Sequence, residues 1–202
     1  DLSMTWFPSH RATPEALDVE DALGRTRAWW TGWAEGCDHD GPYREEVVRS
    51  LLILRALTHF ETGGIVAAAT TSLPESFGGE RNWDYRYVWL RDASLTIAVL
   101  LAHGYNDYVD HWRDWLLRAI AGDPGDVQIM YGLAGERDLE ERDFESLPGY
   151  QGAHPVRVGN GASTQFQADV ISEVMLGLDR GPEAGVPETR FAWALQRALM
   201  GF

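Results

Sequence analysis

The sequence contains no lysine and a single cysteine. All 17 basic residues are arginines, and they face 31 aspartates and glutamates, which leaves a formal net charge of -14. Nucleic-acid phosphates and anionic membrane surfaces repel such an acidic chain, so we expect no nucleic-acid partner and no membrane partner. The lone Cys37 excludes an internal disulfide and a multi-cysteine zinc site. It also favours a reducing compartment, so a cytoplasmic location is expected.

Long apolar runs and metal-ligand patterns are also missing. The longest apolar runs, 65–69 and 97–102, are far shorter than the ~20 residues that cross a bilayer. The histidines are scattered, and His103 and His111 do not have the spacing of metal ligands. We therefore expect no metal and no other cofactor. With 202 residues, of which 45% are hydrophobic, the chain can still bury a sizeable core.

Helical periodicity is the main secondary-structure signal. Apolar residues at helical spacing predict helices over about 14–36, 43–61, 89–103 and 107–121, a fifth that starts near residue 164, and a sixth over 187–202. The fourth has Tyr108, Trp112, Trp115 and Ile120 on one face, and the fifth has Phe166, Val170 and Val174. Asn106 or Asp107 is expected to cap the fourth helix, Ser163 the fifth, and Pro187 to open the sixth. Gly63 and Gly64 are expected to end the second helix as a left-handed cap.

Two long connections, 65–88 and 122–162, contain nearly all the unusual polar and aromatic residues. Long loops in a compact domain are commonly functional. Helices in hairpin-like succession, with such loops at one end of each pair, suggest part of a helical toroid.

Residues 81–92 form the densest of these segments, with four aromatic residues, three arginines and two aspartates. Flat rings suit the C–H face of a pyranose, and charged side chains suit its hydroxyls. This composition indicates carbohydrate binding. The alternative from residue types alone is an Arg–Asp network that joins a loop to a helix.

Residues 155–169 combine small residues with Arg157, Asn160 and Gln165. Small residues let the backbone approach a ligand, and these three side chains offer donors and acceptors. The alternative is a simple turn at Gly159 and Gly161 that leads into a helix.

Residues 135–145 contain several acidic side chains, which could form a paired-carboxylate site within this chain. A solvated face neutralised by Arg137 and Arg142 is the favoured interpretation. Glu136, next to a glycine-rich turn, is kept as a candidate functional residue.

Several motifs together resemble glycoside hydrolase family 15, the family of glucoamylases, glucodextranases and some actinobacterial trehalases. They lie at 70–75, 78–79, 81–92, 131–136, 147–150 and 155–169. The resemblance implies an all-α fold, an (α/α)6 barrel of twelve helices, preceded in bacterial members by a β-sandwich. We expect residues 1–9 to be the last strand of such a sandwich, and residues 10–202 to be the first half of the barrel.

The resemblance also implies an inverting, exo-acting α-glucoside hydrolase whose substrate is an oligosaccharide or disaccharide with α-linked glucose. Carried over by motif position, Arg91 and Asp92 bind hydroxyls of the terminal glucose, and Tyr85 and Trp89 wall the same pocket. Arg157, Gly159 and Asn160 belong to the loop that flanks this pocket. We add Trp83 and Glu136 to the predicted substrate-binding residues.

No catalytic residue is expected within this chain. The family's general acid lies in a Trp-Glu motif, which this sequence does not contain, and its general base lies further on. The remainder of a parent chain, or a second copy, is therefore expected to complete the barrel, and the 202 residues alone are expected to be inactive. Two alternatives remain open: a non-catalytic carbohydrate-binding or regulatory fragment of the same fold, and an internal acidic site in residues 136–145.

Overall fold

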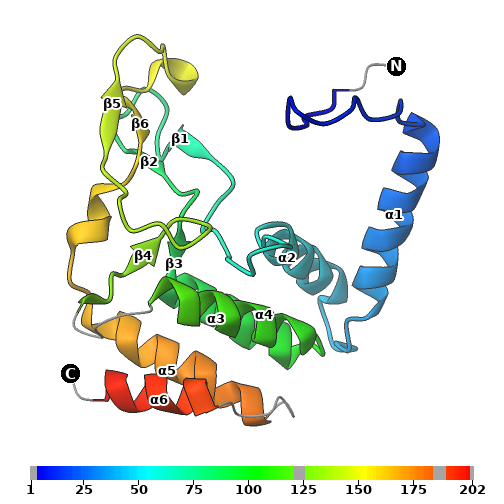
Figure 1. Ribbon diagram of the computed structural model, residues 1–202, viewed down its shortest axis with the longest axis vertical. Coiled ribbons are helices and arrows are strands. Elements are labelled where there is room, and N and C mark those ends of the chain that lie inside the picture. Colours follow the sequence, from blue (N-terminus) through cyan, green and yellow to red (C-terminus); the bar gives the residue numbers. More distant parts are fainter. Residues whose placement is uncertain (1–3, 121–125, 184–189, 201–202) are drawn as a thin grey trace.

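In the part of the chain that the structure describes, six helices dominate, and three short antiparallel strand pairs accompany them (Figure 1). The computed structural model describes residues 4–120, 126–183 and 190–200. The helices are α1 (Val19–Glu35), α2 (Arg44–Ala56), α3 (Leu90–Ala102), α4 (Asp107–Ala119), α5 (Ala168–Glu183) and α6 (Arg190–Leu199). The strands are β1 (Thr71–Pro74), β2 (Asn82–Asp84), β3 (Val88–Trp89), β4 (Met130–Tyr131), β5 (Arg142–Phe144) and β6 (Val156–Val158), with 3-10 turns η2 (Tyr150–Gly152) and η3 (Gly161–Thr164).

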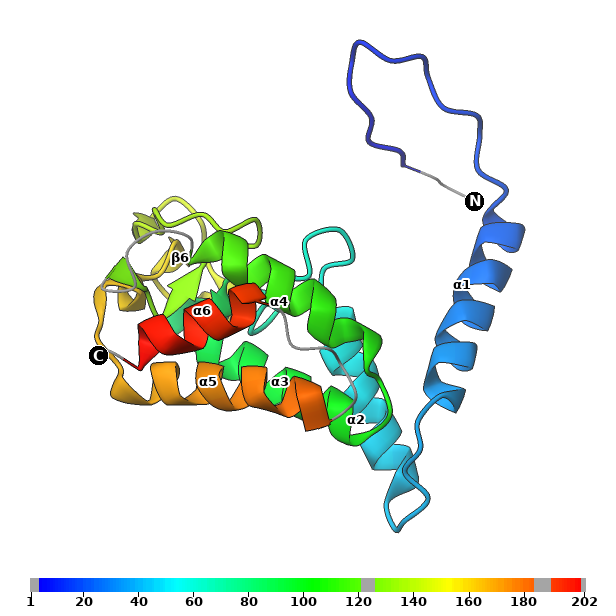
Figure 2. The same cartoon turned by 60° about the horizontal axis from the view of Figure 1, so that its bottom comes forward.

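The main core lies between α3, α4 and α5, whose helical packing is seen most clearly in Figure 2. Each helix contributes buried side chains at helical spacing: Leu90, Ala93 and Ile97 from α3, Trp112, Trp115 and Leu116 from α4, and Val170, Val174 and Leu178 from α5. The predicted apolar positions Trp112 and Trp115 of α4, and Val170 and Val174 of α5, are therefore confirmed as buried.

Helix α1 stands to one side of this core and has no fully buried residue (Figure 2). It begins after Asp18, whose carboxylate accepts the Asp21 N–H at 3.0 Å, as an N-cap does. Its contacts come from its C-terminal half, where the Arg55 guanidinium lies 5.2 Å from the centroid of the Trp29 ring. The Trp33 ring stacks on Tyr105 with centroids 4.1 Å apart, and its Nε1 donates to Tyr108 Oη at 2.8 Å.

The predicted end of the second helix is wrong. Helix α2 ends at Ala56, and the chain turns back through a bridge between Thr58 and Ile65. Arg55 Nη1 donates to the Thr58 carbonyl at 2.9 Å, which holds this turn. Gly63, with φ +78°, lies in the turn, where a Cβ would overlap the His111 carbonyl.

The predicted caps of the later helices are only partly right. Asn106 precedes α4, but its side chain makes no capping hydrogen bond. Ser163 lies buried inside η3 rather than at a helix start, and α5 begins five residues later. Phe166, placed by the pattern on the buried face, is 84% exposed because residues 165–167 are not helical. Pro187 lies outside the described residues.

The expected strand near the start of the chain is not formed, since residues 4–8 have no regular secondary structure. A strand needs a neighbouring strand for its backbone groups, and the described residues offer none to this segment. The assignment of residues 1–9 to a sandwich domain stays a prediction. The all-α expectation also missed the hairpins, which form within the two long connections.

The hairpins β1–β2 and β5–β6 lie side by side (Figure 1), and side-chain hydrogen bonds join them. Thr71 Oγ1 donates to the Arg157 carbonyl at 2.6 Å, and the Arg157 N–H donates to Ser72 Oγ at 2.8 Å. Asn82 Nδ2 adds a bond to the Pro155 carbonyl at 2.9 Å. The third pair, β3–β4, joins two strands that are separated in the chain by α3 and α4, and β3 leads directly into α3. None of the described helices is long and apolar enough to cross a lipid bilayer.

Candidate functional site

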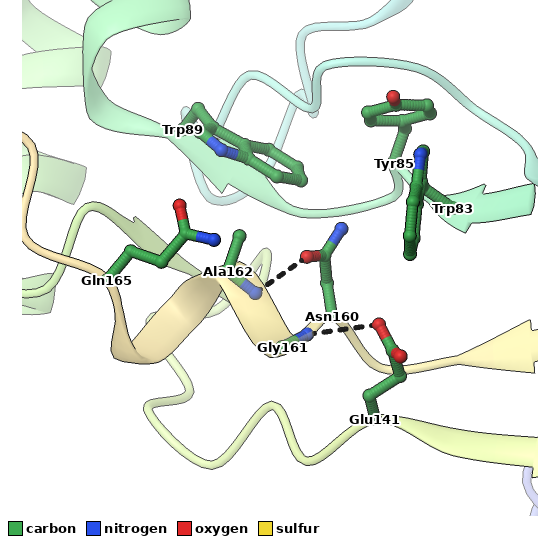
Figure 3. A pocket seen from close by; sticks show the side chains of 8 residues that line it. All are labelled: Trp83, Tyr85, Trp89, Glu141, Asn160, Gly161, Ala162 and Gln165. Carbon is green, nitrogen blue, oxygen red and sulfur yellow. Dashed lines mark hydrogen bonds between the residues drawn. The ribbon is translucent and has the colours of Figure 1, made fainter. Parts of the chain in front are cut away.

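A pocket of about 390 Å³ lies between the β2–β3 segment and residues 160–165 (Figure 3). Its lining comes from two regions more than 50 residues apart in sequence: Trp83, Tyr85, Trp89, Glu141, Asn160, Gly161, Ala162 and Gln165. The structure therefore brings together four of the nine predicted site residues, namely Trp83, Tyr85, Trp89 and Asn160.

Aromatic rings form one side of this pocket (Figure 3). The Tyr85 and Trp89 ring centroids are 5.8 Å apart, and the Arg157 guanidinium lies 4.7 Å from the centroid of the Trp83 ring. Burial, and then the negative charge of Glu75, raise the pKa of Tyr85 above its ordinary value, so its phenol stays a hydrogen-bond donor at neutral pH. Such rings can stack on the C–H faces of a sugar.

Asp84 stands between Trp83 and Tyr85 in the chain, and its carboxylate is fully buried. It accepts hydrogen bonds from Arg86 Nε at 2.9 Å and Nη2 at 2.8 Å, and from the Gly159 N–H at 3.2 Å. Burial alone raises the pKa of Asp84, but the hydrogen bonds and charge of Arg86 and the Gly159 N–H together lower it below its ordinary value. The side chain is therefore ionised at neutral pH, and it ties β2 to the loop after β6.

Asn160 adds to this connection between β2 and the loop after β6, because both ends of its amide form hydrogen bonds. Its Nδ2 donates to the Asp84 carbonyl at 3.0 Å, and its Oδ1 accepts the Ala162 N–H at 3.0 Å. Gly159 beside it has φ +86°, and a Cβ there would overlap the Glu140 carbonyl, so only glycine fits. Asn160 and Gly159 thus shape the pocket wall through bonds within the protein.

Arg157 is a support for the pocket rather than part of its lining. Its Nη1 donates to the Glu80 carbonyl at 2.8 Å, and its Nε lies 3.4 Å from Glu141 Oε1 and 3.3 Å from Asp143 Oδ1. The Arg157 side chain is 15% exposed, and its guanidinium lies over the Trp83 ring and holds that ring in place.

Arg91 and Asp92 lie on the first turn of α3, next to Trp89 in the chain but outside the pocket lining. Arg91 Nη1 donates to Gln167 Oε1 and Asp169 Oδ2, both at 3.0 Å, and Nη2 lies 3.4 Å from Asp92 Oδ2. The hydrogen bond that Arg91 donates to Asp169 is the main cause that raises the pKa of Arg91. In this structure the pair joins the start of α3 to the start of α5, and its binding of sugar hydroxyls stays a prediction.

Glu136 is also outside the pocket. Its Oε2 accepts the Ala134 N–H at 3.0 Å, and its carbonyl accepts the Gly132 N–H at 2.7 Å. The exposed side chain therefore closes a turn, and no contact connects it to the other predicted site residues.

Sequence reasoning missed Glu141, which it grouped with the solvated acidic face. That interpretation fits its neighbour, because Glu140 and Arg142 form an exposed ion pair at 2.7 Å. Arg137 instead donates to the Asp126 carbonyl and lies over the Tyr131 ring. The available signal was the two-residue spacing of Glu141 and Asp143, which puts both carboxylates on one side of a strand.

No group of three or more histidine, cysteine, aspartate or glutamate side chains among the described residues is arranged to hold a metal ion. The site is therefore described by its aromatic rings, its amides and one carboxylate.

Comparison with known proteins identifies the family of this chain. Residues 41–202 match glycosyl hydrolases family 15, so the chain belongs to that family, as its motifs predicted. The trehalase of Mycolicibacterium smegmatis is 38% identical over 173 residues, which cover 84% of this chain and 26% of that protein. The trehalase of Mycobacterium tuberculosis is 38% identical over 178 residues, covering 86% of this chain and 26% of that protein.

A third trehalase gives a similar result. The trehalase of Thermoplasma volcanium is 36% identical over 180 residues, covering 88% of this chain and 28% of that protein. The chain thus spans little more than a quarter of the length of these relatives. No solved structure matches this chain. Family membership implies the (α/α)6 toroid, of which the six helices represent a part.

Proposed function

We propose that this chain supplies the terminal-glucose binding region of an inverting, exo-acting α-glucoside hydrolase with trehalose as its substrate. The supporting observation is the aromatic pocket, in which Trp83, Tyr85 and Trp89 face Asn160 and Gln165. A volume of about 390 Å³ is within the usual range for small-ligand sites. Trehalose is the first candidate substrate because the relatives described above are trehalases.

Hydrolysis with inversion needs a general acid and a general base about 6.5–9.5 Å apart, with a water molecule between the base and the sugar. Among the described lining residues only Glu141 carries a carboxylate, so this pocket does not hold such a pair. We propose that both catalytic glutamates belong to other parts of the full-length protein. The role of the described residues is then to bind and orient the glucosyl unit.

The apolar side chains exposed on α5 and α6 support the same proposal. Leu176, Trp193 and Met200 lie along one groove of these helices and are about half exposed or more. We propose that the remainder of the toroid, or a second copy, covers them, since an uncovered apolar patch is unfavourable in water. Light scattering on the 202-residue chain tests the second-copy version, and a monomer would contradict it.

Hydrolysis by the full-length protein tests the activity. We expect trehalose to be cleaved faster than maltose or isomaltose. Inversion at one anomeric centre releases one β-glucose, while the leaving glucose keeps its α configuration. Early NMR spectra should therefore show the two anomers in equal amounts, and α-glucose alone would contradict inversion. Binding without turnover would favour the non-catalytic, carbohydrate-binding alternative.

A further inference from the structure

Glu141 is the one carboxylate among the described residues that line the pocket. It lies immediately before β5, and in Figure 3 its side chain points from the lower edge of the pocket towards Asn160 and the Trp83 ring. Arg91 and Asp92, the charged residues expected there, are outside the lining. The site therefore presents an acidic group from the β5–β6 hairpin, and this group is Glu141 rather than Asp92 or Glu136.

One hydrogen bond and one ion pair hold this carboxylate in place. Its Oε2 accepts the Gly161 N–H at 3.2 Å, and its Oε1 lies 3.4 Å from Arg157 Nε. Arg157 is itself fixed by Trp83 on one side and by Asp143 on the other. The Glu141 side chain is 28% exposed, so the carboxylate combines fixed orientation with access from the pocket.

An ionised carboxylate has about four lone-pair sites. The Gly161 N–H donates to Oε2, whereas Arg157 Nε lies near Oε1 without forming a hydrogen bond, so acceptor sites on the carboxylate remain for hydroxyl groups. Hydrogen bonds from a hydroxyl to an ionised acceptor are about twice as strong as neutral ones. A sugar ring stacked against the nearby aromatic rings directs its hydroxyls outward from its edge, where such an acceptor can reach them.

We propose that Glu141 is a further substrate-binding residue, whose carboxylate accepts hydrogen bonds from hydroxyls of the glucosyl unit in this pocket. The inference rests on the proposed function, because it assigns a ligand group to the same site. Arg157 acts through Glu141 and Trp83 as a positioning residue. Specificity follows, because a sugar that lacks the hydroxyl leaves the carboxylate without its partner.

The test compares Glu141→Gln with Glu140→Gln in the full-length protein. Glutamine keeps the size of the side chain but removes its charge, so we expect KM for the hydrolysed α-glucoside to rise about tenfold, with a smaller change in kcat. Glu140 is adjacent, exposed and paired with Arg142, so Glu140→Gln should leave KM unchanged within about twofold.

A second control separates ligand binding from support of Arg157. Asp143→Asn removes the other carboxylate near Arg157 Nε but leaves Glu141 in the pocket. A purely structural role predicts similar losses for Glu141→Gln and Asp143→Asn, whereas direct binding predicts a loss for Glu141→Gln alone. With deoxyglucoside substrates, removal of the contacted hydroxyl should raise the KM of the wild type far more than the KM of Glu141→Gln.

The outcomes distinguish this inference from the proposed function. If wild type hydrolyses α-glucosides and Glu141→Gln keeps the wild-type KM, the inference is wrong and the function stands. If wild type neither binds nor cleaves them, the proposed function itself fails. Should Glu141→Gln not fold, Glu141→Asp keeps the charge but withdraws the carboxylate by one methylene, and an unchanged KM for that variant would overturn the inference.

Discussion

The helical core and the pocket region are stabilised by different forces. Between α3, α4 and α5 the contacts are apolar, with residues such as Ile97 and Leu116 fully buried. Around the pocket, by contrast, the buried groups include Asn82, Asp84 and Asn160, and directional hydrogen bonds connect them. Apolar burial has little directionality, whereas a polar network fixes particular distances. The core therefore sets global stability, and the network sets the shape of the pocket.

The largest loss of stability is expected from a substitution in the helical core. Leu116→Ala removes a fully buried side chain from α4 and should lower the free energy of unfolding by about 2–5 kcal/mol. Urea denaturation followed by tryptophan fluorescence measures this change. Leu95→Ala on α3, where the side chain is 47% exposed, is the matched control and should change it by less than about 0.5 kcal/mol. Equal losses would contradict the assignment of the core.

A substitution of Asp84 is expected to lower the free energy of unfolding less than Leu116→Ala does, and to loosen mainly the loop around Gly159. Asp84→Asn leaves Arg86 without its carboxylate and weakens the bond from Gly159, which should cost about 1–3 kcal/mol. Amide hydrogen exchange at Gly159 should accelerate more than exchange in α4. Glu75→Gln, which removes an exposed ion pair with Arg81, serves as the control.

The pH dependence of the same carboxylate follows from its lowered pKa. A carboxyl whose folded pKa lies below its unfolded value stabilises the protein above the unfolded pKa. Because the folded pKa of Asp84 is below 3.8, Gly159 should stay protected from neutral pH down to about that value and lose protection in more acidic solution. Loss of protection already near pH 6 would show that Asp84 does not hold this loop.

The smallest loss of stability is expected from a substitution of Tyr105, whose ring stacks on Trp33 in the last turn of α1. Burial, and then the nearby Cys37, raise the pKa of Tyr105 to about 12. The folded state therefore keeps the phenol proton that the unfolded state loses near pH 10, and stability falls as pH rises from about 10 to 12. Tyr105→Phe should cost about 1 kcal/mol at neutral pH, through loss of the bond to the Trp33 carbonyl.

Unfolding measured at a series of pH values tests this prediction. The stability difference between wild type and Tyr105→Phe should shrink above pH 10, because only wild type carries the titrating phenol. Tyr150→Phe is the control, since that side chain is exposed. A constant difference across this range would contradict a raised pKa for Tyr105.

The helices were predictable because their signal is local. The spacing of Trp112, Trp115 and Ile120 predicts one buried face, and all three are buried in the structure. The hairpins were missed because each strand has only two to four residues, too few for an alternating pattern. Their register depends on partners far along the chain, such as Arg157 opposite Asp143.

The candidate site was predictable to the extent that its residues form dense motifs. Trp83, Tyr85 and Trp89 come from one such motif, and the structure places all three on one pocket. The spacing of Glu141 and Asp143 places both carboxylates on one side of a strand, but the sequence does not say which side faces the pocket. That is decided by the β5–β6 pairing, which turns Glu141 towards Arg157.

By itself, the sequence determined the family, the helices and the aromatic character of the pocket, since motifs and periodicity are properties of neighbouring residues. Only the tertiary structure decided which charged groups face the pocket. It directed Arg91 to Asp169, closed a turn with Glu136 and oriented Glu141 inward. The physical reason is that each charged side chain takes the partner that folding brings within hydrogen-bonding distance, and chain order alone does not specify that partner.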